Sequence, residues 1–192
     1  EITILDICFG LGFNTLATLS YLKEKGIEKK VTIISPELDA ELIASLKDFQ
    51  YPDIFAVFLP IIDAISACHE YKDAHLHVKV VVGDARAYLL TCKDRFDIVY
   101  QDAFSPSSNP MLWTKEYFSD ISKVIKDDGI LTTYSTAFKT RLALYENGFN
   151  VYINSGEGYR NATLASRSLI KLPLVNMEHK ISCNRDVQSL RD

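Results

Sequence analysis

The chain has 192 residues, of which 47% are hydrophobic and 24% are charged, and its formal net charge is −4. These values fit one globular domain over residues 1–192 with a sizeable core. The acidic total argues against broad, charge-driven binding of nucleic acid, although it leaves room for a local basic patch. We therefore expect a single folded domain whose function resides in a defined site.

Membrane proteins and metal-binding proteins fit the sequence poorly. No apolar run approaches the roughly 20 residues that span a bilayer, and no leader with a cleavage site opens the chain, so we expect a cytoplasmic protein. The four cysteines are isolated, without a C-x-x-C pair, which argues against a zinc site or a disulfide framework. His75 and His77 share one predicted strand face, but two imidazoles without a third ligand do not predict a metal site.

Predicted strands and helices alternate along the chain. The hydrophobic pattern predicts strands at residues 3–8, 31–35, 76–82, 96–101 and 130–135. It predicts helices at residues 13–25, 39–48, 86–91, 114–126 and 137–147. The alternation indicates an α/β fold with a mostly parallel sheet, right-handed crossovers and helices on both faces.

The remaining segments have weaker patterns. Residues 49–74 are predicted to hold an inserted or extended helix, and residues 149–154 and 161–165 to form closing strands. Thr114 is predicted to cap its helix, and Gly129 to end it. The tail from Ser168 is polar. Because the chain opens directly on a strand, we expect that an N-terminal segment is missing.

The first predicted strand runs into a glycine turn, in the sequence ILDICFGLGFNT at residues 4–15. An apolar strand that breaks at Gly10 and Gly12 and resumes with helical spacing marks the first βα unit of a nucleotide-binding domain. Glycine lets a ligand approach the free N–H groups at the start of the helix. Thr15 stands where a dinucleotide-binding turn has a third glycine, which favours S-adenosylmethionine, a cofactor without phosphate.

Acidic residues follow the next three long predicted strands. Glu37 ends the second strand, Asp84 follows the third and Asp102 follows the fourth. Ligands of parallel sheets lie beyond the carboxyl ends of the strands, so these carboxylates form one set with the glycine turn. We expect Glu37 to hold the ribose hydroxyls and Asp84 to accept from the adenine amino group; the alternative for Asp84 is a helix N-cap. Asp102 is expected to hold the methionine ammonium or to face the substrate.

The loop after Asp102, AFSPSSNPMLWT at residues 103–114, is stiffened by prolines and flanked by aromatic residues. Such a loop can hold a planar substrate, and four rings are candidates to stack on an unpaired base: Phe104, Trp113, Tyr134 and Tyr159. The alternative for Trp113 is that it fixes the following helix to the core. A basic face is possible in the last third of the chain, at Lys139, Arg141, Arg160, Arg167 and Lys171.

The string DAFSPSSNPMLWT at residues 102–114, together with GLGFN at residues 10–14, resembles the methyltransferase domain of the MnmC family. That family uses S-adenosylmethionine to methylate the aminomethyl arm of 5-aminomethyl-(2-thio)uridine at the wobble position of certain tRNAs. The resemblance extends to about Ala165. It implies a Rossmann-like class I methyltransferase fold with an antiparallel closing strand, a tRNA anticodon loop as partner, no metal, and a separate flavin-dependent oxidase acting upstream.

Residues of this chain that match the family pattern, or flank it, form the expected site. The expected cofactor contacts are Gly10, Gly12, Asn14, Glu37, Asp84, Ala85 and Asp102. Asp102 is also the expected catalytic residue. The expected substrate contacts are Phe104, Pro106, Asn109, Trp113, Tyr134 and Arg160.

The chain departs from the family pattern in two places. Family members carry additional residues before the glycine turn, and many are fused to the oxidase. The sequence GEGYRN at residues 156–161 also replaces a more basic Gly-x-Gly-x-Lys-Arg stretch. Both departures bear on tRNA binding more than on cofactor binding.

Two alternative functions remain. GDAR at residues 83–86 and FDIVYQD at residues 96–102 also resemble aminopropyltransferases of the spermidine-synthase kind. Their loop after the fourth strand normally continues with acidic residues, whereas this loop continues Ala-Phe-Ser-Pro, which favours a methyltransferase. The other alternative is a non-catalytic module that keeps the fold and binds protein or RNA through the aromatic loop.

Overall fold

The computed structural model describes all 192 residues, Glu1–Asp192. The chain forms two compact units, Glu1–Tyr88 and Leu89–Asp192. Helix α4 (Ala85–Thr91) contains the boundary between them. The expected single domain over residues 1–192 stays a prediction.

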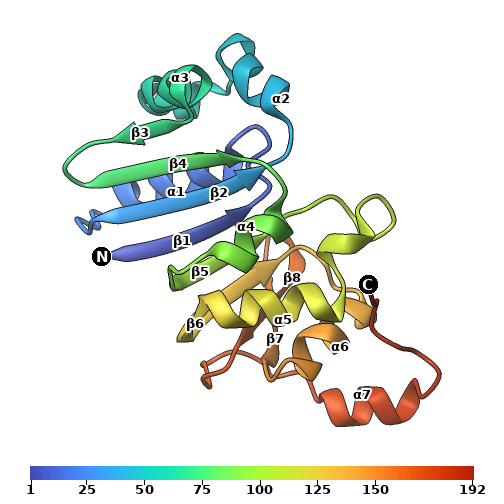
Figure 1. Ribbon diagram of the computed structural model, residues 1–192. Coiled ribbons are helices and arrows are strands. Elements are labelled where there is room, and N and C mark those ends of the chain that lie inside the picture. Colours follow the sequence, from blue (N-terminus) through green and yellow to red (C-terminus); the bar gives the residue numbers. More distant parts are fainter. The chain divides into compact units, whose positions relative to one another are not determined.

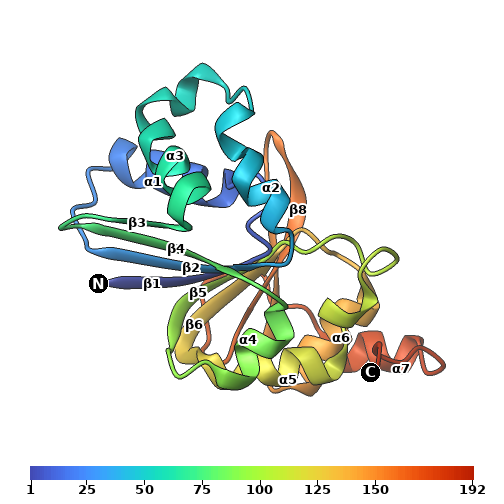
Figure 2. The same ribbon diagram turned by 45° about the horizontal axis from the view of Figure 1, so that its top comes forward.

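The first unit is a small sheet with helices on one face. Its strands are β1 (Ile2–Ile7), β2 (Val31–Glu37), β3 (Glu70–Lys72) and β4 (Leu76–Val82). β1 pairs with β2 and β2 with β4 in parallel, while β3 lies antiparallel at the edge of β4. Its helices are α1 (Phe13–Glu24), α2 (Ala40–Ser45) and α3 (Leu59–Cys68), with 3-10 turns η1 (Leu46–Asp48) and η2 (Asp53–Phe58). Helices α1 and α3 lie on the same face of the sheet, above the strands in Figure 2.

The second unit combines a parallel pair of strands with an antiparallel pair. Its strands are β5 (Phe96–Gln101), β6 (Ile125–Thr133), β7 (Asn150–Gly156) and β8 (Tyr159–Ser166). β5 and β6 are parallel, and β8 lies between β6 and β7, antiparallel to both. Its helices are α5 (Lys115–Val124), α6 (Phe138–Glu146) and α7 (Met177–Cys183), with the 3-10 turn η3 (Pro110–Leu112). Helices α5 and α6 lie side by side (Figure 1). The expected mostly parallel sheet with an antiparallel closing strand is confirmed.

The role predicted for Gly129 is wrong. Helix α5 begins after its Thr114 cap as predicted, but it ends at Val124, and Gly129 lies inside β6. A Cβ on Gly129 would lie 2.9 Å from the carbonyl oxygen of Phe96 and 2.7 Å from the Ile125 side chain. Glycine is therefore required by the close approach of β5 and β6, where the strand register shifts between Phe96 and Ile98.

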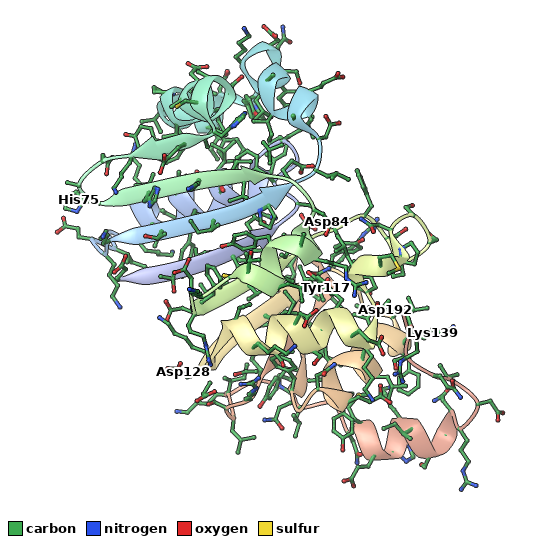
Figure 3. All side chains as sticks on the ribbon, viewed as in Figure 1. His75, Asp84, Tyr117, Asp128, Lys139 and Asp192 are labelled. Atoms are coloured by element: carbon green, nitrogen blue, oxygen red, sulfur yellow. The ribbon has the colours of Figure 1, made fainter.

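The sequence pattern did not predict β3 or α7. β3 has only three residues at a sheet edge, and α7 has seven residues in a polar tail. The end of that tail is fixed to the start of α5, since the Thr114 hydroxyl donates to the Asp192 carboxylate at 2.7 Å and the Lys115 N–H donates to the Leu190 carbonyl at 2.8 Å. Figure 3 marks Asp192 beside that helix.

No single helix has the length and hydrophobicity needed to cross a bilayer. The segments Ala40–Asp48 and Asp53–Cys68 meet those criteria only when taken together, and they meet at a bend of 111°.

Candidate cofactor and acceptor site

The turn after β1 holds both predicted glycines in the left-handed region, with φ of +56° at Gly10 and +74° at Gly12. The two glycines differ in their surroundings. A Cβ on Gly12 would lie 2.8 Å from the ring of Phe9, whereas a Cβ on Gly10 would meet no atom within 4 Å. Gly12 is thus required by packing inside the turn. Gly10 leaves open space where a ligand can approach the backbone.

The Glu37 carboxylate connects the end of β2 to this turn. One of its oxygens accepts from the Gly10 N–H and the other from the Asp39 N–H, both at 3.0 Å. The residue is 8% exposed. A carboxylate offers about four acceptor positions, so each oxygen retains capacity for a ligand hydroxyl. The structure therefore brings Gly10 and Glu37 together, as the sequence predicted.

A buried carboxylate beneath the turn was missed by sequence reasoning. Asp6 is fully buried in β1, and one of its oxygens accepts from the Asn14 side-chain amide at 3.0 Å. Asn14 thus ties the first turn of α1 to the strand that precedes it, and its expected cofactor contact stays a prediction. The available signal was an acidic residue in the middle of an apolar strand.

Tyr51 also supports the turn without having been predicted. Its hydroxyl donates to the Leu11 carbonyl at 2.9 Å, and burial raises the pKa of Tyr51 to about 12. The ring packs against Phe13 at the start of α1 and against Phe49 after η1, with centroid distances of 5.9 and 4.8 Å. The hydroxyl consequently remains a hydrogen-bond donor throughout the physiological pH range.

Asp84 occupies the end of β4 (Figure 3). Its Oδ1 accepts from the Ala87 N–H at 2.9 Å, so the alternative of a helix N-cap is confirmed. The side chain is exposed, and this bond occupies only its Oδ1. Capping and ligand binding are compatible at this residue, next to the buried Ala85.

Asp102 is exposed and follows β5, and Tyr134, which follows β6, lies near enough to feel its charge. The Tyr134 hydroxyl donates to the Ala103 carbonyl at 2.9 Å. Partial burial, and to a lesser extent the charge of Asp102, raise the pKa of Tyr134. The structure therefore brings the expected catalytic carboxylate and one expected substrate residue together within the second unit.

Trp113 is an anchor and offers no ring face to a ligand. It is 0% exposed, its indole N–H donates to the Phe104 carbonyl at 2.7 Å, and its ring meets Tyr134 edge-on with centroids 5.8 Å apart. This corrects the expected stacking role, because a fully buried ring cannot receive a base. Phe104 is the opposite case, since its side chain is 81% exposed.

The rest of the loop is a compact turn. The Ser105 carbonyl accepts from the N–H groups of Ser108 and Asn109 at 2.8 and 2.9 Å. Pro106 and Asn109 are half-buried. The side-chain amide of Asn109 has donors and an acceptor that can serve a ligand.

The expected basic face is smaller than predicted. Arg141 is 8% exposed, and Arg167 is occupied by Asp127 and by the Ser122 carbonyl. Arg160 on β8 and Lys139 on α6 are exposed (Lys139 is marked in Figure 3). Arg167 is thus paired within the fold, and Arg141 exposes only a small part of its surface.

Comparison with known proteins identifies the chemistry of this arrangement. The family described as S-adenosyl-L-methionine-dependent methyltransferase matches residues 55–168. The chain belongs to this family. Its cofactor is therefore S-adenosyl-L-methionine. The matched segment includes Asp84 and the whole loop after β5.

Three individual proteins are similar to this methyltransferase. The crystal structure of MnmC2 from Aquifex aeolicus has a TM-score of 0.79 and 33% identity, and covers 100% of this chain and 62% of that chain. An uncharacterised protein of Methanocaldococcus jannaschii is 31% identical over 170 residues, which are 86% of this chain and 46% of that protein. The tRNA 5-methylaminomethyl-2-thiouridine biosynthesis bifunctional protein MnmC of Paraburkholderia xenovorans is 25% identical over 177 residues, with 86% and 27% covered. This chain thus spans less than half of either curated relative.

The residues of the methyltransferase fit its cofactor. The approach to the backbone at Gly10 is open, Glu37 keeps acceptor capacity at the turn, and the exposed Asp84 uses Oδ1 for its helix cap. These are the groups that a ribose diol and an adenine amino group require.

Proposed function

We propose that this methyltransferase transfers a methyl group to the aminomethyl nitrogen of 5-aminomethyl-(2-thio)uridine at the wobble position of tRNA. The similarity to MnmC2 of Aquifex aeolicus, at 33% identity over the full length of this chain, carries the proposal. The loop with its exposed Phe104 and neighbouring Asp102 supports it, because a modified base needs a flat surface and the amine needs an acceptor.

The first unit holds the cofactor in this proposal. Bound S-adenosylmethionine supplies a methyl group already activated on a sulfonium. Gly10 lets it reach the turn, Glu37 accepts from the ribose hydroxyls and Asp84 accepts from the adenine amino group. Alignment of the nucleophile with the methyl group then accounts for most of the rate gain, and no metal or covalent nucleophile is needed.

The second unit presents the acceptor. A wobble uridine is already unpaired, so it is extruded into a site at low cost, and Phe104 stacks on its ring. Asp102 faces the amine and keeps it oriented through its carboxylate. The amine lone pair forms the new N–C bond as the C–S bond breaks, and the nitrogen loses one proton. Asp102 either accepts that proton or anchors the cofactor ammonium.

The partners follow from the same chemistry. The acceptor amine must be produced before methylation, and we propose that a separate flavin-dependent oxidase, acting in the cytoplasm, supplies it on the anticodon loop. The bifunctional MnmC proteins that this chain resembles are much longer, since this chain spans 27% of the one from Paraburkholderia xenovorans.

Labelled S-adenosylmethionine and tRNA carrying 5-aminomethyluridine test the proposal. A parallel reaction offers decarboxylated S-adenosylmethionine and putrescine. We expect label in the tRNA and no aminopropyl transfer. Aminopropylation of putrescine would establish the alternative enzyme, while tight cofactor binding without transfer in either reaction would indicate a non-catalytic module.

A further inference from the structure

Arg141, in the first half of α6, is a buried cation without a carboxylate partner. Its Nε donates to the Thr163 hydroxyl at 2.9 Å, and that hydroxyl donates to the Ser135 carbonyl at 2.7 Å. No acidic side chain lies within ion-pair distance of its guanidinium. Burial lowers the pKa of Arg141, as expected for a charge removed from water without compensation.

The surroundings of Arg141 are neutral and polar. Ser135, Thr140 and Thr163 are buried, and the Ser135 and Thr140 hydroxyls lie 3.1 Å apart. Hydroxyl groups solvate a cation only partly, so the arrangement weakens folding relative to an apolar side chain of similar size. A residue that reduces stability in this way indicates a role in function.

The guanidinium retains donors for a ligand. Only its Nε has a hydrogen-bond partner in the protein, and neither terminal nitrogen is both sealed from solvent and without a partner. The N–H groups of these two nitrogens form the flat fork that binds the oxygens of a phosphate in pairs. The Nε of Arg141 is therefore fixed by Thr163, and its two terminal nitrogens are the donors left for a ligand.

The position of Arg141 connects it to the loop after β5, at residues 103–114. Ser135 follows Tyr134, whose hydroxyl is bound to the carbonyl of Ala103, the residue after Asp102. Helix α6 starts at Phe138 without a side-chain cap, and Lys139 is exposed in its first turn. Arg141 and the exposed Lys139 thus both lie in the first turns of a helix in the unit that contains the loop after β5.

We propose that Arg141 binds a backbone phosphate of the RNA next to the nucleotide that is methylated. The proposal rests on the proposed function and adds a residue that fixes the acceptor strand. Arg141 acts as a positioning residue, because it touches the substrate away from the reacting atoms. It sets the register of the strand so that the base enters beside Asp102 and Phe104.

Arg141→Gln is the test variant, and Arg185→Gln is the control. Arg185 is exposed just after α7, and its substitution changes the net charge by the same amount. The KM for 5-aminomethyluridine tRNA should rise about tenfold or more in Arg141→Gln, as for loss of a charge-assisted hydrogen bond. The logarithmic salt slope of binding should fall by about 1. In Arg141→Lys the KM for this tRNA should rise less, because lysine keeps the positive charge and loses only the paired N–H groups of the guanidinium.

Two further readouts separate this role from others. The melting temperature of Arg141→Gln should equal or exceed that of the wild type, and its affinity for S-adenosylmethionine should not change. A lower melting temperature would show that Arg141 has a structural role. Weaker cofactor binding would show that Arg141 binds an anionic group of the cofactor and not of the RNA. Either result overturns the proposal. So does an unchanged KM while the wild type is active.

Direct RNA binding distinguishes failure of this inference from failure of the proposed function. Fluorescence anisotropy with an unmodified anticodon stem-loop needs no turnover. If the wild type methylates no tRNA, the proposed function fails. The phosphate site then stands only if Arg141→Gln binds this RNA at least several-fold more weakly than Arg185→Gln, and equal binding overturns it.

Discussion

The turn after β1 and the loop after β5 are built on different principles. In the turn, backbone groups form the surface, since Gly10 is open to solvent and its N–H is held by Glu37. In the loop, side chains hold the backbone, since the half-exposed Tyr134 and the buried Trp113 donate to two consecutive carbonyls, those of Ala103 and Phe104.

This difference shows how each region is specified. A glycine turn has few alternatives, because only glycine tolerates left-handed backbone and close approach at the same positions. The loop depends on two rings that hold the backbone next to Asp102 and Phe104, and the buried Trp113 acts there without an open ring face. Substitutions in the loop should therefore fall into two groups: those that lower the stability of the fold and those that change only the binding of the acceptor RNA.

The largest effect is expected for Trp113→Ala. The ring is fully buried and makes the bond to the Phe104 carbonyl, so its loss should reduce the free energy of unfolding by about 3–5 kcal/mol. Urea denaturation measures this. Phe104→Ala is the matched variant on the same loop, and it should change stability by less than about 0.5 kcal/mol while raising the KM for tRNA. Equal stability losses would contradict the assigned roles.

An intermediate effect is expected for Asp102→Asn. Loss of a charge-assisted partner should lower kcat/KM by about 30-fold or more, on the order of 2 kcal/mol. Asp97→Asn is the control on the same strand, where the carboxylate pairs with Lys126 at 2.7 Å. Steady-state methyl transfer compares the two. Equal activity of both variants would remove Asp102 from the site.

The smallest effect is expected for Tyr134→Phe. It keeps the ring against Trp113 and removes only the hydroxyl bond to the Ala103 carbonyl, worth about 1 kcal/mol. We expect a severalfold lower kcat with unchanged cofactor affinity. A change confined to cofactor affinity would show that the hydroxyl serves the other region.

The sequence predicted elements with strong local patterns. β4 and β5 have the predicted bounds because their apolar runs are interrupted at both ends. Gly129 was misinterpreted because glycine ends helices and also permits close strand approach, and only the packing against Phe96 decides between the two.

The site was predicted unevenly for a similar reason. Gly10 and Asp102 follow β1 and β5, and Glu37 ends β2, so the predicted strand ends were enough to select these residues. Tyr51 and Arg141 act through contacts with Leu11 and Thr163, residues 40 and 22 positions away in sequence. Such long-range partners have no local signature, and burial of a ring or a guanidinium cannot be predicted from residue type alone.

Calorimetric titration with S-adenosylmethionine tests most directly whether the turn after β1 holds the cofactor. Glu37→Ala removes the expected ribose acceptors, and Gly10→Val fills the open approach at a backbone of positive φ. Glu41→Ala, an exposed change of the same charge on α2, is the control. We expect both test variants to bind at least tenfold more weakly than the control. Wild-type affinity in both, with folding intact, would place the cofactor elsewhere and contradict the account.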